Sequence, residues 1–271
     1  MRPLPSHPPA LRDRQEPAPA AAPGCVWLVG AGPGDPELLT LKAARLIAGA
    51  DVVIHDRLVG PGVLALAPAG AVRIEVGKRP GGESWRQADI DALMVARARA
   101  GARVVRLKSG DPGVYGRLDE EMDALDAAGI GFEVVPGVTS AAAAAAEIKV
   151  SLTRRGRNKS LRLLTGHDVD GFAEHDWRAL AAPGAVAAIY MGVRAARFLQ
   201  GRLMLHGCAA DTPATAVENA TRADRKVVAA PLSRLPEALV EAGVSGPAIL
   251  FLGLQPRGAV LALDELRAEA V

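Results

Sequence analysis

Short apolar runs alternate along most of the chain with longer stretches in which apolar residues recur at helical spacing. Before residue 137, five of these runs predict β-strands, and the helices between them are expected to begin near Pro36, Arg86 and Gly116. The predicted strands are CVWLV (25–29), ADVVIHD (50–56), VRIEV (72–76), RVVRLKS (103–109) and FEVV (132–135). This alternation is typical of an α/β protein with a largely parallel sheet.

A second series of runs follows a turn at PGVTS (136–140) and a predicted helix at AAAAAAE (141–147), for which a Ser or Thr is available as the cap. Its predicted strands are LRLLTG (161–166), AVAAIYMG (185–192), PATAVEN (213–219), KVVAA (226–230) and PAILFLG (247–253). Two α/β lobes, residues 24–137 and 138–258, fit the chain length better than one continuous sheet. The cleft between the lobes is then the expected ligand site.

Composition limits the classes of partner. Lys and Arg (32) nearly balance Asp and Glu (30), so the net charge of +2 gives no case for nucleic acid or an anionic membrane. Cys25 and Cys208 lie outside any zinc-binding or disulfide spacing, so we expect no metal site and reduced thiols in the cytoplasm. No apolar stretch approaches the roughly 20 residues of a membrane span, and the Pro- and Ala-rich residues 1–23 lack a signal-peptide core. We therefore expect a soluble protein with a disordered tail at 1–23 and a second tail at 259–271.

The glycine-rich turn in VWLVGAGPGDPELLTLK (26–42) follows the first predicted strand and precedes a helical pattern. A dinucleotide-binding turn needs G-x-G-x-x-G with backbone N–H groups free for phosphate. Here the spacing is G-x-G-x-G, Pro33 has no N–H and Asp35 would repel a pyrophosphate. The turn is therefore weak evidence for a dinucleotide, although Asp56 does close the next strand.

Nine motifs in a fixed order carry a more specific signal, and together they resemble the tetrapyrrole methylase family, in particular its uroporphyrinogen-III C-methyltransferases. They are GAGPGDPELLTLKA, DRLV, GKRPGG, RVVRLKSGDPGVYGR, EVVPGVTSA, SLTRRG, LLTGHD, YMG and VENAT. The resemblance covers about residues 25–257. The resemblance implies the two-lobed, non-Rossmann fold of class III S-adenosylmethionine methyltransferases, with the cofactor in the cleft and two subunits in a homodimer. It also implies methylation of uroporphyrinogen III at carbons 2 and 7, giving precorrin-2 through precorrin-1 for sirohaem and cobalamin synthesis, with S-adenosylhomocysteine as the by-product.

The resemblance assigns cofactor contacts residue by residue. Glycines in these loops would let the backbone approach the cofactor closely, and the small or apolar positions would surround adenine and sulfur. Without the family, an Ala or Met here would simply be a core residue. The matched positions are Pro33, Ser109, Gly110, Asp111, Val114, Ser140, Ala141, Met191, Ala220 and Ala248.

For the tetrapyrrole, the resemblance assigns catalytic roles to Arg117 and Glu120 in YGRLDEE and to Asp56. Asp56 either orients a pyrrole N–H or assists proton removal, and a helix cap is the structural alternative. The resemblance also assigns Arg155 to the substrate, because guanidinium groups suit the carboxylates of uroporphyrinogen. Arg154 and Lys108 are expected to contact the substrate as well, and together with Arg106 and Arg157 they add positive charge around it.

Departures from the usual family pattern lie beside these residues. The loop SGDPGVYGR and the motif TRRG differ from the common GGDPFIFGR and THRG, and SGDPG-x-YG also resembles later precorrin methyltransferases. A later corrin-ring methylase is therefore the alternative within the family, and a diphthine synthase shares the fold. A nicotinamide-dependent dehydrogenase or a non-catalytic binding module is the alternative outside it, but no second nucleotide fingerprint occurs, so we expect a single-function enzyme.

Overall fold

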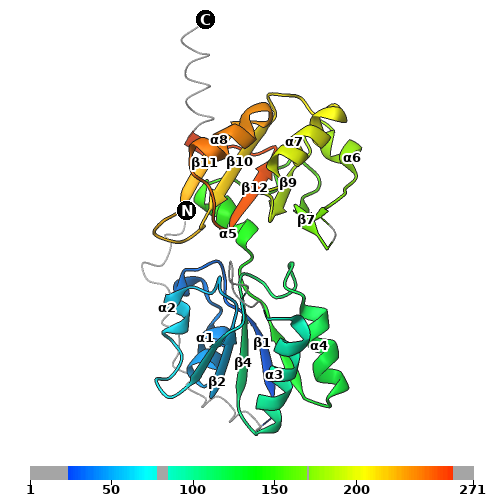
Figure 1. Cartoon of the computed structure of the whole chain (residues 1–271). Coiled ribbons are helices and arrows are strands. Elements are labelled where there is room, and N and C mark those ends of the chain that lie inside the picture. The colour runs from blue at the N-terminus through cyan, green and yellow to red at the C-terminus, as the bar shows by residue number, and fades with distance from the viewer. Residues whose placement is uncertain (1–23, 78–84, 170, 259–271) are drawn as a thin grey trace, which may run out of the picture.

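The computed structural model describes residues 24–77, 85–169 and 171–258. The first half of the chain forms a sheet of five parallel strands in the order β3-β2-β4-β1-β5 (Figure 1). Its strands are β1 (Val26–Gly30), β2 (Val52–His55), β3 (Val72–Glu75), β4 (Val104–Lys108) and β5 (Phe132–Val135). The five predicted strands are therefore confirmed to within two residues at each end.

Helices cover both faces of this sheet. Helices α1 (Leu41–Ala48) and α2 (Pro61–Leu64) bury apolar side chains against one face, and α3 (Gln87–Arg99) and α4 (Leu118–Ala127) against the other. The expected helix near Pro36 is a short 3-10 turn, η1 (Pro36–Leu38), and α1 begins only at Leu41. Two successive caps explain this break: the Asp35 carboxylate accepts from Glu37 N, and the Thr40 hydroxyl accepts from Ala43 N.

The second sheet has the order β11-β10-β12-β9-β6 and is mixed, so a largely parallel architecture is wrong for this lobe. Only β6 and β9 are parallel, while β12 runs antiparallel to both of its neighbours. The connection 219–225 between β10 and β11 is too short for the helical crossover that parallel neighbours need. The strands are β6 (Arg162–Thr165), β9 (Ala187–Tyr190), β10 (Pro213–Glu218), β11 (Lys226–Pro231) and β12 (Ala248–Leu252).

The helices of the second lobe pack on opposite faces of its sheet. One face is covered by α6 (Trp177–Ala181), α7 (Ala196–Leu205) and α8 (Leu235–Glu241), and the other by the alanine-rich α5 (Ser140–Glu147). A hairpin, β7 (His167–Asp168) with β8 (Gly171–Phe172), and a 3-10 turn, η2 (Leu232–Arg234), complete the lobe. Figure 1 shows α5 between the two sheets, directly after the last strand of the first one. We place the lobe boundary at residues 137–138 as a proposal.

Three sequence predictions fall outside the described residues: the two tails and most of the GKRPGG motif. Within the described part of the chain, no helix has the length and apolar character needed to cross a membrane.

Candidate active site

Three strand ends of the first sheet are packed backbone against backbone. A Cβ atom on Gly30, which ends β1, would lie 2.6 Å from the Gly137 nitrogen, and one on Gly137 would lie 2.3 Å from the Gly110 oxygen. Gly32 and Gly110 also exchange backbone hydrogen bonds of 3.1 and 2.8 Å. We expected the glycines of the first turn to let the backbone approach the cofactor. In the structure, Gly30 instead allows close contact with the backbone of Gly110 and Gly137 in the neighbouring loops.

The junction of β1 and β4 is the switch point of this sheet. The chain leaves β1 toward the α1 face and leaves β4 toward the α4 face, so the two loops diverge at their carboxyl ends. Open α/β sheets bind ligands at such a point. The predicted Pro33 lies in the loop after β1 and is buried, whereas Ser109 and Val114 are half-buried in the loop after β4.

Asp111 fixes the loop after β4 through its carboxylate. One oxygen accepts from Gly113 N at 2.9 Å, and the other accepts from Gly137 N at 3.0 Å. The carboxylate is therefore engaged by backbone groups, and its contribution at the site is to hold the loop against the segment that leads into α5.

The facing edge of the second sheet carries the remaining predicted cofactor contacts. Met191 follows β9 and is 52% exposed. Ala248 begins β12 and pairs with Glu218, the last residue of β10. The buried Ala220 follows Glu218 by two residues. Ser140 and Ala141 open α5, and the Ser140 hydroxyl lies 3.5 Å from the position that a Cβ on Gly110 would occupy. The predicted contacts thus follow two sheet edges and the start of the helix between them.

Hydrogen bonds between the lobes show that these two edges face each other. The Asp35 N–H donates to Thr221 Oγ1 at 3.2 Å, and the Tyr115 hydroxyl donates to the carbonyl of Leu163 at 2.8 Å. The Arg222 guanidinium donates to the carbonyl of Leu58, in the loop after β2, at 2.5 Å.

Strained backbone is concentrated in the same loops. Among the described residues, six that are not glycine have a positive φ, and five of these follow β4, β9 or β10. A positive φ costs a non-glycine residue free energy and persists where the surroundings fix it, which occurs often at functional sites. The five residues and their φ angles are Tyr115 (55°), Arg117 (53°), Met191 (53°), Asn219 (50°) and Thr221 (68°).

A buried ion cluster lies under the loop after β4. Arg106 Nη2 is 2.6 Å from Asp56 Oδ1, its Nε is 3.0 Å from Glu121 Oε1, and Lys108 Nζ is 2.7 Å from the same Glu121 oxygen. Arg106, Lys108 and Glu121 are 3%, 2% and 0% exposed, whereas Asp56 is 33% exposed. Burial and the nearby charge of Arg106 lower the pKa of Lys108, and the two carboxylates outweigh burial to raise the pKa of Arg106. This geometry argues against the expected substrate contact by Lys108, whose ammonium is directed to Glu121.

Arg117 and Glu120 form a second, exposed ion pair at the start of α4. Two parallel hydrogen bonds of 2.7 and 2.6 Å join the guanidinium to the carboxylate, and the side chains are 55% and 50% exposed. The pairing raises the pKa of Arg117 and lowers that of Glu120. The structure thus brings these two predicted residues together, and it joins the third, Asp56, to Arg106.

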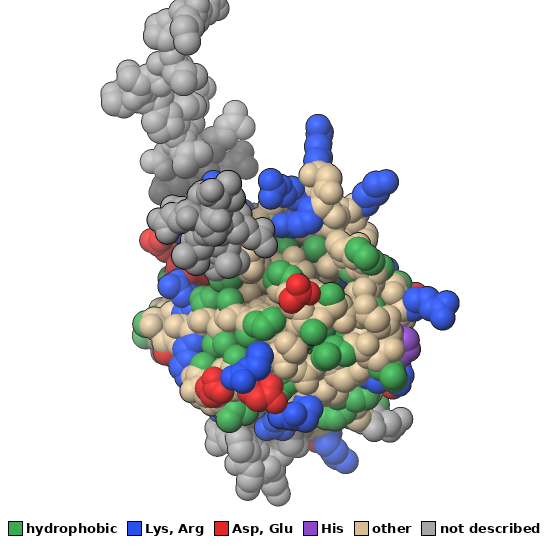
Figure 2. Space-filling view, turned by 90° about the horizontal axis from the view of Figure 1, so that it is seen from above, with side chains coloured by type: hydrophobic (Ala, Val, Ile, Leu, Met, Phe, Trp, Pro, Cys, Tyr) green, Lys and Arg blue, Asp and Glu red, His purple; other side chains and the backbone are tan. Residues whose placement is uncertain are grey.

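Arg154 and Arg155 are exposed in a loop that Asn158 organises. The Asn158 side chain accepts from Arg154 N at 3.2 Å and donates to the carbonyls of Leu152 and Ser160. Neither guanidinium forms an ion pair with another described residue. Figure 2 looks onto the C-terminal lobe from above and shows Lys and Arg around the margin of that face, with hydrophobic side chains between them.

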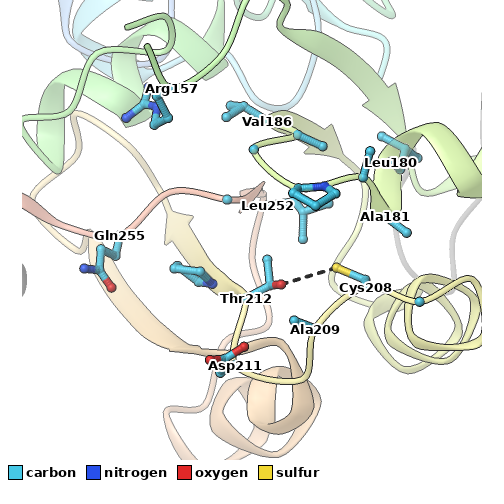
Figure 3. Close-up of a pocket in the computed structure, with 17 residues that line it drawn as sticks. Arg157, Leu180, Ala181, Val186, Cys208, Ala209, Asp211, Thr212, Leu252 and Gln255 are labelled. Atoms are coloured by element: carbon cyan, nitrogen blue, oxygen red, sulfur yellow. Dashed lines mark hydrogen bonds between the residues drawn. The ribbon is translucent and has the colours of Figure 1, made fainter.

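A cavity of about 590 Å³ lies at the opposite edge of the second sheet (Figure 3). It is lined by Val186 before β9, Leu252 at the end of β12 and Thr212 before β10, and the Cys208 thiol donates to the Thr212 hydroxyl at 3.4 Å. None of the predicted site residues lines this cavity.

Sequence reasoning missed Glu121, Tyr190 and Thr139. Glu121 carried a usable signal, because it lies four residues before the buried Leu125 on α4 and therefore on the inward face. Tyr190 lay within the YMG motif, and it is one of only two tyrosines in the chain.

The curated relatives that this chain matches include siroheme synthases. That of Chromobacterium violaceum is 46% identical over 230 residues, which cover 85% of this chain and 49% of that protein. That of Pseudomonas paraeruginosa is 44% identical over 232 residues, 86% of this chain and 50% of that protein. The chain therefore spans about half the length of these relatives.

Solved structures match the same region. A uroporphyrin-III C-methyltransferase from Thermus thermophilus, determined with S-adenosylhomocysteine, has a TM-score of 0.72 and 41% identity, over 84% of this chain and 91% of that one. A cobalt precorrin-4 methyltransferase has a TM-score of 0.77 and 30% identity, over 85% and 95%. The family model for tetrapyrrole (corrin/porphyrin) methylases matches residues 25–236. With its paired five-stranded sheets and the expected order of motifs, the chain belongs to the tetrapyrrole methylase family.

Proposed function

We propose that this chain transfers methyl groups from S-adenosylmethionine to carbons 2 and 7 of uroporphyrinogen III, giving precorrin-2 through precorrin-1. The observation that carries the proposal is the placement of the motif residues. Although they are scattered from Pro33 to Ala248, they lie along the two sheet edges that face each other. The likeness to the Thermus uroporphyrin-III enzyme supports the choice of substrate within the family.

The residues present fit the cofactor. The backbone at Gly110 and the exposed thioether of Met191 give backbone and apolar surfaces of the kind that adenine and a sulfonium need. Ala141 and Ala220 are buried and keep the side chains at their positions small. When bound, S-adenosylmethionine supplies a methyl group already activated for transfer. The pyrrole carbon is nucleophilic in the way an enamine is, so the protein supplies position and charge rather than a nucleophile.

Arg117 and Asp56 have different tasks in this proposal. The guanidinium of Arg117 is exposed and already forms a bidentate pair with Glu120, so a carboxylate of the substrate can exchange with Glu120. Asp56 is fixed by Arg106 through one oxygen, and its other oxygen lies 3.4 Å from Ser109 N. A carboxylate held in a fixed position is suited to accept a hydrogen bond from a pyrrole N–H or to take up the departing proton; the pair with Arg106 supplies the position, not the basicity. Arg154 and Arg155, both exposed, are proposed to attract further substrate carboxylates.

The direct test is incubation with uroporphyrinogen III and methyl-labelled cofactor. We expect two labels in one tetrapyrrole product, and the absence of any labelled dimethyl product would refute the substrate. Arg117→Ala is expected to abolish turnover while S-adenosylhomocysteine binding, measured by calorimetry, stays within about twofold of wild type. A variant that loses this binding would show that Arg117 serves the cofactor instead.

A later precorrin methyltransferase is the second candidate, and it is favoured by the TM-score of 0.77 to the cobalt precorrin-4 enzyme. The same assay with a precorrin-4-type substrate separates the two, because label should enter only one of the tetrapyrroles. We also propose that the protein is cytoplasmic, in keeping with its two free cysteines. We propose in addition that it forms a homodimer, which light scattering on the purified chain tests.

A further inference from the structure

The two tyrosines of this chain meet across the lobe interface. The ring of Tyr115, in the loop after β4, lies 5.0 Å from that of Tyr190, at the end of β9, with an angle of 52° between the rings. The Tyr115 hydroxyl also donates to the Leu163 carbonyl in β6 at 2.8 Å. A side chain of the first lobe is thus attached to two adjacent strands of the second sheet.

The Tyr190 hydroxyl continues this connection to the start of α5. Thr139 occupies the cap position of α5 but does not bond to its own helix; its hydroxyl lies 2.5 Å from Tyr190 Oη. The N–H of Ala141 donates to the same Tyr190 oxygen at 3.3 Å. Tyr190 therefore satisfies a helix N–H that the cap residue normally satisfies, and this ties α5 to β9.

The backbone on both sides of the ring contact is in the left-handed region. Tyr115 has a φ of 55° and Met191, which follows Tyr190, a φ of 53°. The next residue, Gly116, packs directly against the Pro112 carbonyl, since a Cβ there would lie 2.3 Å from that oxygen. Non-glycine residues keep such angles only where surrounding contacts determine them.

We propose that Tyr115 and Tyr190 are positioning residues that set the spacing of three cofactor-contacting segments. Each linked residue adjoins a proposed cofactor contact: Tyr115 follows Val114, Thr139 precedes Ser140, and Tyr190 precedes Met191. The three segments come from β4, α5 and β9, and the tyrosine contacts join them without either ring having to touch the reacting atoms. This inference rests on the proposed function, since it assigns those segments to S-adenosylmethionine.

The first test removes one hydroxyl. In Tyr115→Phe the ring remains and only the bond to the Leu163 carbonyl is lost, so the affinity for S-adenosylhomocysteine should fall by about threefold to tenfold. The KM for S-adenosylmethionine should rise by the same factor, kcat at saturating cofactor should stay within about twofold, and Tm should not change, because Tyr115 is 45% exposed. Amides of residues 109–117 and 139–147 should exchange hydrogen faster in the variant.

Ring removal has a matched control in the chain. Phe172 is 46% exposed, and the aromatic rings it contacts among the described residues, His167 and Phe198, belong to its own lobe. Phe172→Leu should therefore leave cofactor affinity unchanged, while Tyr115→Leu weakens it further than Tyr115→Phe. Thr139→Val and Tyr190→Phe complete a double-mutant cycle. If the two hydroxyls act through each other, the double variant should bind cofactor no more weakly than Tyr190→Phe alone.

The outcomes separate the two proposals. A wild-type chain that binds no S-adenosylhomocysteine overturns the proposed function and the positioning role together. A wild-type chain that binds it, with Tyr115→Phe and Tyr190→Phe binding equally well, overturns the positioning role alone. A loss of affinity in Phe172→Leu equal to that in Tyr115→Leu would do the same, because it would show a general effect of aromatic packing.

Discussion

Glu121 offers a sharp test of the buried ion cluster. Its Oε1 forms the ion pair with Lys108, and the same oxygen also holds Arg106. Glu121→Gln keeps the shape and a neutral acceptor but leaves two buried cations with Asp56 alone. Removing one partner of a buried pair costs about 3–5 kcal/mol of unfolding free energy.

The protonation of Lys108 limits this cost. If Lys108 loses its proton in the folded variant, only one buried cation remains. Removing that proton costs about 1.4 kcal/mol for each pH unit by which the solution lies below about 10.4, the pKa of lysine in the unfolded chain. At pH 7.5 that limit is about 4 kcal/mol, so we expect Glu121→Gln to lose about 3–4 kcal/mol. Between the folded and unfolded pKa values the unfolded chain holds a proton that the folded chain lacks, so unfolding free energy rises with pH. The variant, in which the pKa of Lys108 falls further, should therefore recover toward wild type between pH 7.5 and 9.5.

Urea unfolding followed through tryptophan fluorescence, to which Trp27, buried in the first lobe, contributes, measures the effect. Glu120→Gln is the matched control: it makes the same change one residue earlier on α4, in an exposed pair, and should cost less than about 1 kcal/mol. Lys108→Met with Glu121→Gln should be more stable than Glu121→Gln alone. The reasoning fails if Glu121→Gln lies within 1 kcal/mol of wild type at pH 7.5, or if its deficit grows as the pH is raised.

Two further predictions concern the first lobe. Gly30→Ala would place a Cβ 2.6 Å from one backbone nitrogen and 2.8 Å from a backbone oxygen, and should cost about 1–3 kcal/mol in urea unfolding and weaken S-adenosylhomocysteine binding. Gly70→Ala, with nothing within 4 Å of the new Cβ, should be neutral; equal effects would contradict the packing argument. Arg103 lowers the pKa of Asp51 to about 2, so this pair stabilises the fold fully above about pH 4 and its contribution is lost as the pH falls toward 2. Asp51→Asn should reduce the loss of unfolding free energy between about pH 4 and pH 2 by less than about 1 kcal/mol, because both side chains are exposed. A larger reduction would indicate that the pair is buried in solution.

The strands of both lobes were predictable because β-branched and apolar runs are bounded by turn residues. Strand direction in the second lobe was not, since direction depends on which strands become neighbours. The insertion of β12 between β9 and β10 joins segments far apart in the sequence. The strand β11 lies at an edge of the sheet and alternates between exposed and half-buried positions, but its sequence KVVAAP shows no polar and apolar alternation that would have predicted this.

The charged residues of β4 show why site prediction from sequence was partial. Arg106 and Lys108 alternate along the strand, and the positive charge was interpreted as facing an anionic substrate. In the structure that face is covered by α3 and α4, and the neutralising carboxylates come from Asp56, 50 residues before Arg106, and from Glu121. A pairing over that separation cannot be seen in a local pattern. The exposed pair Arg117 and Glu120 is local, and there the sequence spacing sufficed.

The loop after β4 contacts several parts of the proposed site. Gly110 pairs with the loop after β1, the Asp111 carboxylate holds the segment before α5, and Tyr115 reaches the second sheet. At its base, Arg106 on β4 fixes Asp56 at the end of β2, and at its far end Arg117 begins α4. Because one continuous segment sets all these contacts, a shift of this loop would move the proposed cofactor residues and the proposed catalytic residues together. Under the proposed function, substrate positioning and cofactor binding are then coupled through the backbone, and this coupling accounts for strain at Tyr115 and Arg117, where glycine would remove it.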